Sequence, residues 1–377
     1  MEDKLYLKKK IFNEVADISL GKGYETRVEI GGVVFSIKTD DYKLKRLIKK
    51  RFKTFVSKNT PDLFIEVQIR EQIQTKGFGE IEVVKGKGEN LFIHSPYAGL
   101  VDLEQRKGKL AIRMREDVSP VETFLRICSS YFLPDYDGVL LHAASVNSYN
   151  KGFVFCGQSE CGKSTIARLS RRYSVFTDEI SIIRRIGNTY RVFSTPFWGE
   201  MQGGIADVNS SAKVETIFFP RKNKKVYLKK ITSFKSLPEI MRSTLFFAND
   251  DVRAQKIFEL CHGIAEKIPC YELHFLPDNS FWRCILMKEK LLKRGEKTAS
   301  RIVEGEAIIF TPEDSTIHSL NEVGTRIWEL LEEERSIEDI VKTVCNEYEI
   351  EEKEAEQDIV EFIKELHGKK IVDVKDS

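Results

Sequence analysis

The stretch GQSECGKS, residues 157–164, constrains the fold of this chain more than any other. It follows the apolar segment GFVFC and precedes KSTIARLSRR, which has the apolar spacing of a helix. A glycine, four residues and then Gly-Lys-Ser, set between a strand and a helix, is the arrangement of a phosphate-binding loop. The backbone amides of such a loop curl around an anion, and the following helix presents further unpaired N–H groups to it. The stretch therefore predicts a site for a nucleotide phosphate.

Nine consecutive residues of this loop are candidate nucleotide ligands. They are Gly157, Gln158, Ser159, Glu160, Cys161, Gly162, Lys163, Ser164 and Thr165. The ammonium of Lys163 supplies a point charge for the β- and γ-phosphates, and the hydroxyl of Ser164 can ligate magnesium. ATP and Mg²⁺ are therefore the expected cofactors.

The composition is that of a folded chain with hydrophobic cores. With 377 residues, 41% of them hydrophobic, the chain has room for two or three domains. No apolar run approaches the roughly 18 residues that a membrane helix needs, and the N-terminal residues lack the apolar region of a signal peptide. The seven cysteines are scattered without a C-x-x-C pair, which argues against a zinc site or a disulfide framework. We expect a cytoplasmic protein with free thiols.

The sequence pattern divides the chain into three blocks and a linker. Residues 1–120 have the pattern of an α+β domain of unclear role, and residues 121–287 contain the phosphate loop. Residues 288–300 are charged and poor in apolar side chains, which is typical of a linker. Residues 301–377 hold 9 basic and 22 acidic side chains, a net charge of −13, whereas the rest of the chain carries +15. This asymmetry indicates modules with different partners.

The residues beyond the loop indicate a mixed sheet. The stretch VFTDEISIIRRIGNTYRVF predicts a strand that runs into a hairpin with Gly187-Asn188 as its turn. A doubly wound fold would place a crossover helix there instead. Asp178, at the strand end, is a candidate base or metal ligand, although a single Asp in this position also forms turns. His142 lies on the apolar strand GVLLHAASV, where a core histidine is the simpler interpretation.

Four segments in order, LLHAASV, GQSECGKST, VFTDEISII and STPFWGE, resemble the HPr kinase/phosphorylase-type serine kinases, which are relatives of phosphoenolpyruvate carboxykinase. With IPCYELHFLPDNSFW at its end, the block resembles more narrowly the HPr-kinase-like enzymes of ribosomal-peptide biosynthesis. The resemblance implies an α/β fold with a mixed-sheet kinase core. It implies that Asp178 accepts the proton of the attacking hydroxyl while His142 orients that hydroxyl. It also implies that Glu179 and Ser164 hold magnesium and that Glu200 lines the metal site.

Two departures from that family concern charged residues. Glu160 stands where such loops usually carry glycine, which places a carboxylate near the phosphates. Glu179 replaces the more usual second aspartate, so its role as a metal ligand is less secure. The chain also shows no clear counterpart of the segment that those enzymes use for phosphorolysis. The resemblance therefore implies a kinase and leaves the reverse reaction open.

The third block resembles the PqqD family, small winged-helix-like modules that bind the leader peptides of ribosomally made, modified peptides. The matching stretches are EGEAIIFTPEDSTIHSLNEVGTRIWELL, RSIEDIVKTVCNEYEI and DIVEFIKELHGKKIV. The resemblance implies three short strands with three helices, and a leader peptide that adds to the third strand, residues 315–319. Ile317 and Ser319 on that strand and Ile363 on the last helix are the candidate peptide-binding residues. The net charge of −13 argues against a nucleic acid as the partner.

A kinase joined to a leader-binding module predicts a kinase of a precursor peptide, because tethering raises the effective concentration of the acceptor hydroxyl. Two alternatives remain open. The chain could be a kinase of a folded carrier protein or a small molecule, with the third block serving only assembly. It could also be a peptide chaperone whose phosphate loop senses nucleotide without catalysis.

Overall fold

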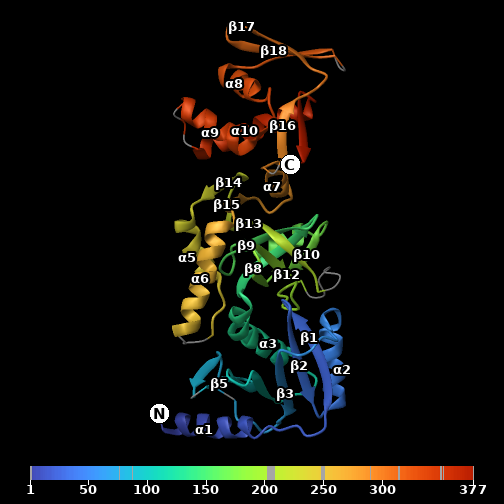
Figure 1. The fold of residues 1–377 in the computed structure, drawn as a ribbon, viewed down its shortest axis with the longest axis vertical. Coiled ribbons are helices and arrows are strands. Elements are labelled where there is room, and N and C mark those ends of the chain that lie inside the picture. Colours follow the sequence, from blue (N-terminus) through green and yellow to red (C-terminus); the bar gives the residue numbers. More distant parts are fainter. Residues whose placement is uncertain are drawn as a thin grey trace. The chain divides into compact units, whose positions relative to one another are not determined.

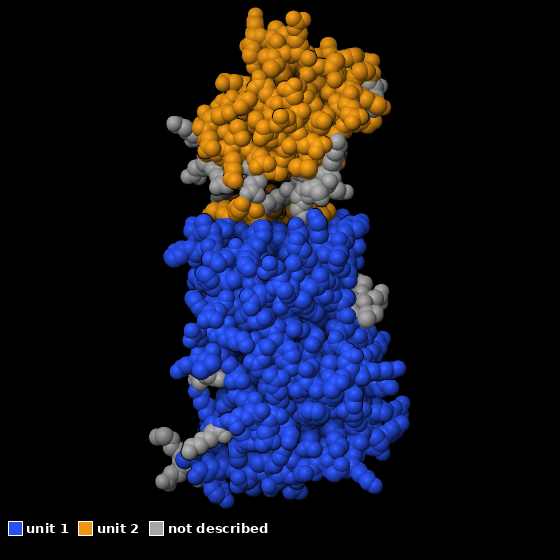
Figure 2. Space-filling view, in the orientation of Figure 1, with its two compact units in different colours: residues 1–219, 231–270 blue, residues 220–230, 271–377 orange. Residues whose placement is uncertain are grey.

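The computed structural model describes residues 2–75, 77–86, 88–201, 209–247, 251–288, 290–312, 315–348, 350 and 352–376. The chain forms two compact units (Figure 2). Unit 1 comprises Met1–Phe219 and Ile231–Cys270, and unit 2 comprises Pro220–Lys230 and Tyr271–Ser377. Mixed sheets with helices confirm the predicted α/β class (Figure 1). Within the described part of the chain, no helix is both long and apolar enough to span a membrane.

The first sheet of unit 1 has seven strands in the order β1-β2-β3-β7-β6-β5-β4. These strands are Tyr24–Ile30, Val33–Thr39, Leu63–Ile69, Glu82–Lys85, Glu89–His94, Tyr97–Asp102 and Lys107–Ile112, numbered β1 to β7 along the chain. The pairs β2–β3 and β3–β7 are parallel and the others antiparallel. Gly31 and Gly32 join β1 to β2 with φ of 60° and 75°, the left-handed backbone that a two-residue hairpin turn requires.

Two helices pack on this sheet. α1 (Glu2–Ala16) contacts β6 and β7, and α2 (Tyr42–Arg51) contacts β1 and β2. Asp41 caps α2, since its side chain accepts a hydrogen bond of 2.8 Å from the Leu44 amide. A 3-10 turn, η1 (Lys53–Phe55), follows α2.

The second sheet of unit 1 contains the strand that leads into the phosphate loop. Its strands here are β8 (Gly138–Ser148), β9 (Lys151–Cys156), β10 (Ser174–Thr177), β11 (Ile180–Ile186), β12 (Thr189–Phe193) and β13 (Ser211–Lys222). β8, β11, β12, β13 and β9 pair in turn, and β9 pairs back to β8, so these five strands close a ring. The β11–β12 hairpin turns at Gly187, as predicted, and the parallel pair β9–β13 among antiparallel neighbours confirms the mixed sheet.

Helix α3 (Ser119–Phe132) joins the two sheets of unit 1 into one core (Figure 1). It contacts β6 and β7 of the first sheet and β8 of the second. One cluster of buried side chains includes Val28 from the first sheet, Phe124 from α3 and Ile182 from the second sheet. The first 120 residues therefore share a hydrophobic core with the loop-bearing sheet. The helices α4 (Lys163–Leu169), α5 (Ser233–Ser243) and α6 (Asp251–Lys267) and the turn η2 (Leu133–Tyr136) complete the unit.

Unit 2 contains most of β14 (Tyr227–Ile231) and β15 (Cys270–Phe275), followed by α7 (Ser280–Lys288) and two three-stranded sheets. The first sheet has the order β20-β16-β21, with the strands Arg335–Ser336, Lys290–Arg294 and Val372–Asp376. The second has the order β17-β18-β19, with the strands Ala299–Val303, Glu306–Thr311 and Thr316–Ser319. The helices α8 (Glu322–Leu330), α9 (Ile337–Tyr348) and α10 (Glu352–Gly368) follow them.

Two local features of unit 2 concern the predicted linker and the start of helix α9. The segment 288–300, expected to be a linker, contains β16, because Leu292 is fully buried in the core of this unit. Ser336 caps the start of α9. The Ser336 hydroxyl accepts from the Asp339 amide at 3.1 Å and donates to the Asp339 carboxylate at 2.8 Å.

Candidate functional site

The phosphate loop connects β9 to α4, as predicted. Gly162 has a φ of 106° and precedes the first turn of α4. A Cβ at Gly157 would lie 2.6 Å from the Cys161 Sγ, which is closer than such atoms approach, so the closed curl of the loop requires glycine there. The side chains at the crown of the loop, Gln158 and Ser159, are exposed. The loop is thus a preformed curl of backbone that opens to solvent.

Lys163 lies inside this curl. It is only 5% exposed, and its Nζ donates to the carbonyls of Gly157 and Gln158, both at 2.8 Å. Burial lowers the pKa of this ammonium, while nearby Cys161 raises it in part. The Lys163 ammonium is therefore next to the loop backbone, where it could contact a phosphate bound by the amides of the same loop.

Glu160 has a backbone conformation that explains its unusual position. Its φ of 68° lies in the left-handed region, which favours glycine because a Cβ is crowded there. The family noted above usually carries glycine at this place in the loop. The glutamate is exposed, so its carboxylate remains in solvent at the mouth of the loop.

Asp178 is buried in the turn between β10 and β11. It is 1% exposed, and its two carboxylate oxygens accept the amides of Gly199 at 2.9 Å and Met201 at 3.0 Å. The Thr177 hydroxyl fixes the same turn, because it donates to the Phe197 carbonyl at 2.7 Å and accepts from the Glu179 amide at 3.2 Å. The aspartate therefore holds the segment 195–201, called here the PFW loop, against the end of β10.

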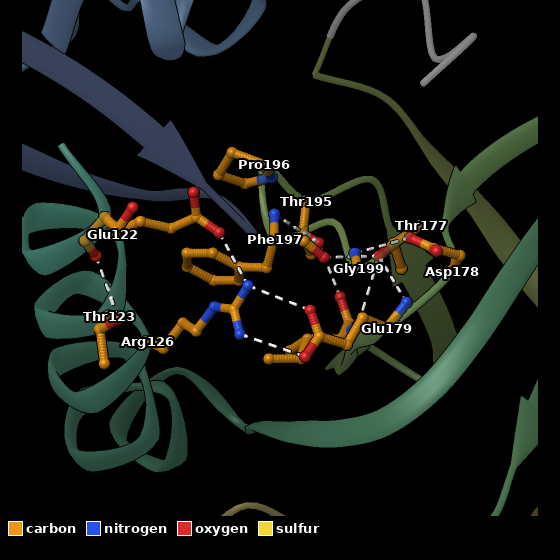
Figure 3. Close-up of polar contacts among 12 residues, drawn as sticks. Glu122, Thr123, Arg126, Thr177, Asp178, Glu179, Thr195, Pro196, Phe197 and Gly199 are labelled. Carbon is orange, nitrogen blue, oxygen red and sulfur yellow. Dashed lines mark hydrogen bonds and ion pairs between the residues drawn. The ribbon is translucent and has the colours of Figure 1, made fainter. Parts of the chain in front are cut away.

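Glu179 faces the other way, into a group of charged side chains (Figure 3). The Arg126 Nη2 lies 3.1 Å from Glu179 Oε2, and the Nη1 lies 3.4 Å from Oε1. The same Nη2 lies 2.7 Å from an oxygen of Glu122, one turn earlier on α3. The guanidinium carbon of Arg126 is 5.4 Å from the centroid of the Phe197 ring. One arginine therefore pairs with two glutamates and covers an aromatic side chain of the PFW loop.

His142 is brought to the site by strand register. It pairs with Ile180 of β11, directly after Glu179, and its carbonyl faces the Gly157 amide at 3.5 Å. Burial lowers the pKa of His142, and the positive charges of Lys163 and Arg126 lower it further. The imidazole is therefore neutral at pH 7 and can donate or accept one hydrogen bond at each ring nitrogen.

The residues expected to hold magnesium are arranged unequally. Ser164 lies half-buried in the first turn of α4, beside the nucleotide candidate Thr165, and the Glu179 side chain is 32% exposed. Glu200 is exposed, and within the described part of the chain it forms no hydrogen bond or ion pair with Ser164 or Glu179. Among the described residues, no three His, Cys, Asp or Glu side chains come together as a metal cage. Ser164 and Glu179 remain the candidate ligands for a magnesium ion, which typically uses one or two carboxylates together with phosphate oxygens.

Arg126 is a residue of the candidate site that the sequence analysis did not single out. It contacts Glu179, which is 53 residues away along the chain, so no local motif marks the pair. The only local signal is the spacing of Glu122 and Arg126, an i,i+4 pair on a predicted helix. That signal occurs on many solvent-facing helices and does not point to a site.

In unit 2 the third strand, β19, lies at the edge of its sheet, as predicted. The Leu320 amide donates to the Ala307 carbonyl at 2.9 Å, which fixes which residues of β19 bond to β18. Because such bonds alternate along an antiparallel pair, the main-chain groups of Ile317 and Ser319 point away from β18. Both side chains are exposed, with Ile317 at 69%. These two residues therefore form an open edge.

The structure corrects the prediction for Ile363. This side chain is fully buried in the core of unit 2, so it is not available to a peptide. The adjoining residue Phe362, about 100° further around the helix, is only partly buried. It lines a cavity of about 480 Å³ between α8, α9 and α10, together with Val323 and Asp358.

Comparison with known proteins identifies two parts of the chain. Residues 306–372 match the family model described as Coenzyme PQQ synthesis protein D (PqqD), so unit 2 contains a PqqD domain. Residues 110–293 match the family model described as SynChlorMet cassette protein ScmC. A solved structure described as TbiB1 in complex with the TbiA(beta) leader peptide is 31% identical, over 22% of this chain and 94% of that one, with a TM-score of 0.21. A search of curated proteins finds no match.

Proposed function

We propose that this chain is an ATP-dependent serine kinase that phosphorylates a hydroxyl of a ribosomally made precursor peptide captured by its PqqD domain. The observation that carries the proposal is the position of Lys163, buried inside a closed glycine loop with its ammonium on two loop carbonyls. His142 lies on β8, which pairs with β9 at the start of that loop, and Asp178 lies in the turn before β11, which pairs with β8. The resemblance to HPr-kinase-type enzymes in the same segments supports the same reaction.

In the proposed reaction the acceptor oxygen bonds to the γ-phosphorus of ATP while the bond from that phosphorus to the bridging oxygen breaks. The proton of the acceptor hydroxyl passes to Asp178, and ADP leaves with the electron pair of the broken bond. Each Asp178 oxygen accepts one backbone amide and has a further lone pair for that proton. Because the side chain is 1% exposed, the proposed transfer requires the PFW loop to move aside so that the hydroxyl reaches it. His142, neutral at pH 7, orients the hydroxyl by one hydrogen bond.

Lys163 and the loop amides would hold the phosphates, and Ser164 with Glu179 would hold the magnesium ion. The ion, when bound with ATP, neutralises charge on the β- and γ-phosphates. Lys163 would exchange its two carbonyl partners for phosphate oxygens, which are stronger acceptors because they are charged. Arg126 would remain the counter-ion of Glu179 on the side away from the nucleotide.

The PqqD domain would capture the leader part of the peptide. An extended leader can add to β19 through the outward main-chain groups of Ile317 and Ser319. Its side chains on one face would reach the helices beside the strand, where Phe362 lines an apolar cavity. Main-chain hydrogen bonds would supply most of the affinity, and the cavity would select one apolar side chain of the leader. Leaders of varied sequence could therefore bind if they share that one side chain.

The direct test uses the full chain with Mg·ATP and a peptide encoded by a short serine-containing reading frame beside its gene. Intact mass spectrometry should show a gain of one phosphoryl group on the peptide, and fragmentation should locate it on a hydroxyl. A gain of phosphate on a folded carrier protein, with none on the peptide, would overturn the choice of substrate. Hydrolysis of ATP without any phosphorylated product would overturn the transfer reaction.

One observation favours a second candidate, a peptide binder that senses nucleotide without catalysis. The carboxylates of Asp178 and Glu179 both have protein partners, and a nucleotide sensor needs neither of them free. In that case Mg·ATP should change leader affinity while no phosphoryl group reaches any peptide. The mass measurement and a leader-binding titration with and without nucleotide separate the two candidates.

A further inference from the structure

The N-terminal block reaches the PFW loop through α2 and η1. The Arg51 Nη2, in the last turn of α2, donates to the Pro196 carbonyl at 2.8 Å. Further along the same connection, the Asn209 amide faces the Thr54 carbonyl at 3.4 Å, and the Asn209 side chain donates to the Glu29 carbonyl at 3.0 Å. The block therefore contacts the chain on both sides of Met201.

Arg51 also begins a row of alternating charges that ends at the candidate metal ligand. Its Nη2 lies 2.5 Å from one oxygen of Glu122, whose other oxygen lies 2.7 Å from Arg126. Arg126 in turn pairs with Glu179. We call these four residues the ion row. Their side chains are between 12% and 32% exposed, so solvent screens them less than it screens an exposed pair.

We propose that residues 1–120 are a positioning element of the kinase site: Arg51 fixes Glu122, Glu122 fixes Arg126, and Arg126 sets the orientation of the Glu179 carboxylate. The inference rests on the proposed function and gives the N-terminal block a role in it. A second partner that orients a metal ligand typically changes metal affinity by 10–100-fold when it is lost. Arg51, which contacts no reacting atom, is a positioning residue.

The ion row also affects the PFW loop, because the loop is hydrogen-bonded both to Asp178 and to Arg51. Asp178 holds the amides of Gly199 and Met201 from inside, while Arg51 holds the Pro196 carbonyl from outside. Arg126 covers the Phe197 ring between them. A shift of the ion row would therefore move the loop and the Glu179 carboxylate together, and leave the glycine loop in place.

The test compares Arg51→Met with Lys50→Met in the full chain. Methionine keeps the apolar stem of the side chain and removes only its charge and donors. Lys50 is the adjoining exposed residue and lies outside the ion row. Electron paramagnetic resonance would measure Mn²⁺ binding to the ATP-loaded protein, and a fluorescent ATP analogue in EDTA would measure nucleotide binding without metal. Hydrogen–deuterium exchange of residues 195–201 would be followed in the metal-free protein.

Arg51→Met should weaken Mn²⁺ binding about 10-fold and speed exchange at Gly199 and Met201, while metal-free nucleotide affinity stays unchanged. Arg51→Lys should restore part of the Mn²⁺ affinity, and Lys50→Met should match the unmodified chain. If Arg51→Met unfolds the block, seen as fast exchange in β1 and β2, Glu122→Gln provides the same comparison. The double variant Glu122→Gln/Arg126→Met should lose no more Mn²⁺ affinity than Arg126→Met alone, because both substitutions interrupt the same ion row.

Unchanged Mn²⁺ affinity and unchanged exchange in both single variants would overturn the positioning role, even in a chain that transfers phosphate. Equal losses of metal-dependent and metal-free nucleotide binding would also overturn it, because the defect would then be a general one. A failure of the unmodified chain to bind ATP at all would overturn the proposed function instead. In that event the exchange at Gly199 and Met201 alone decides whether the N-terminal block positions the PFW loop.

Discussion

In unit 1 the candidate phosphate site consists of polar groups with fixed hydrogen-bond partners. In unit 2 the candidate peptide site is an edge strand whose outward main-chain groups face away from the described strands of its sheet. Lys163 and Asp178 are each at most 5% exposed and hydrogen-bonded to backbone, while Ile317 is 69% exposed on an open strand edge. Preorganised groups suit a reaction whose charge must be stabilised at fixed points. An open edge suits a ligand read mainly by its main chain. The two sites should therefore respond differently to single substitutions.

The largest effect is expected at the buried ammonium. Lys163→Ala should lower phosphoryl transfer by roughly 10³ or more, because a fixed positive charge at the phosphates is lost. The fold should survive, since burial of this charge is not a favourable term by itself. Peptide phosphorylation by mass spectrometry and circular dichroism would check both statements. Undiminished turnover in a folded Lys163→Ala protein would show that the buried ammonium is not needed for phosphoryl transfer, and the proposed difference between the two sites would be wrong.

The next effect concerns the buried carboxylate. Asp178→Asn should lower turnover by roughly 10² or more, because the amide cannot take the hydroxyl proton. One oxygen of the new side chain can still accept an amide of the PFW loop, so ATP binding should remain. Single-turnover transfer and ATP affinity would be measured together. Loss of ATP affinity with transfer preserved would make Asp178 a metal ligand and show the base assignment to be wrong.

At the open edge a substitution should affect capture alone. Ile317→Pro removes one outward N–H and no bond to β18, so leader affinity should fall about 10-fold while the PqqD domain stays folded. Ile317→Ala, which keeps that N–H, is the matched control for the side chain. Fluorescence anisotropy with a labelled leader peptide would measure both.

Phosphorylation of a core peptide without its leader, at high concentration, should be the same in Ile317→Pro as in the unmodified chain. A slower leaderless reaction would mean that unit 2 supports the kinase structurally. Removal of residues 301–377 is a poorer test, because Leu292 of β16 packs in the same core and would be uncovered.

The contrast also shows what the sequence could predict. The glycine loop and the Gly187-Asn188 hairpin turn are local patterns, and each lies where the sequence predicts it. The edge of β19 followed from the PqqD resemblance. The partners of Glu179 did not follow from any pattern, because Arg126 reaches it only after α3 packs between two sheets.

Pairings that are distant in sequence were missed for the same reason. β16 joins β21 across some 80 residues, with Leu292 facing Val374, so a short charged segment with two leucines had the pattern of a linker. Helix α1 was also not predicted, since its stretch EDKLYLKKKIFNEVA is rich in lysine and has a weak apolar stripe. Only packing of Ile11 and Val15 on the first sheet reveals its role.

A smaller effect is expected from pH. Because burial and nearby cations lower the pKa of His142, the folded state binds this proton less readily than the unfolded chain does. The contribution of neutral His142 to stability is present above pH 6.5 and is lost as pH falls below it. The melting temperature should therefore fall less between pH 7.5 and pH 5.5 in His142→Gln than in the unmodified chain. Equal falls would mean that His142 titrates alike in both states.

The smallest effect is expected at the strained crown of the glycine loop. Glu160 has a left-handed backbone, which costs a residue with a Cβ about 1 kcal/mol relative to glycine. Glu160→Gly should therefore raise the free energy of unfolding by about 0.5–1 kcal/mol, measured by chemical denaturation. Ser159→Gly is the matched control, because Ser159 has no such φ and should lose stability from added chain entropy.

Glu160→Gln separates strain from charge at this position, since glutamine keeps the Cβ and removes the carboxylate. Glu160→Gln should leave stability unchanged and tighten ATP binding, because a negative charge at the mouth of the loop repels phosphate. Glu160→Gly should do both, gaining stability and affinity together. If Glu160→Gly is no more stable than Ser159→Gly, the left-handed conformation is not a strain on the loop, and the glutamate is accommodated there without cost.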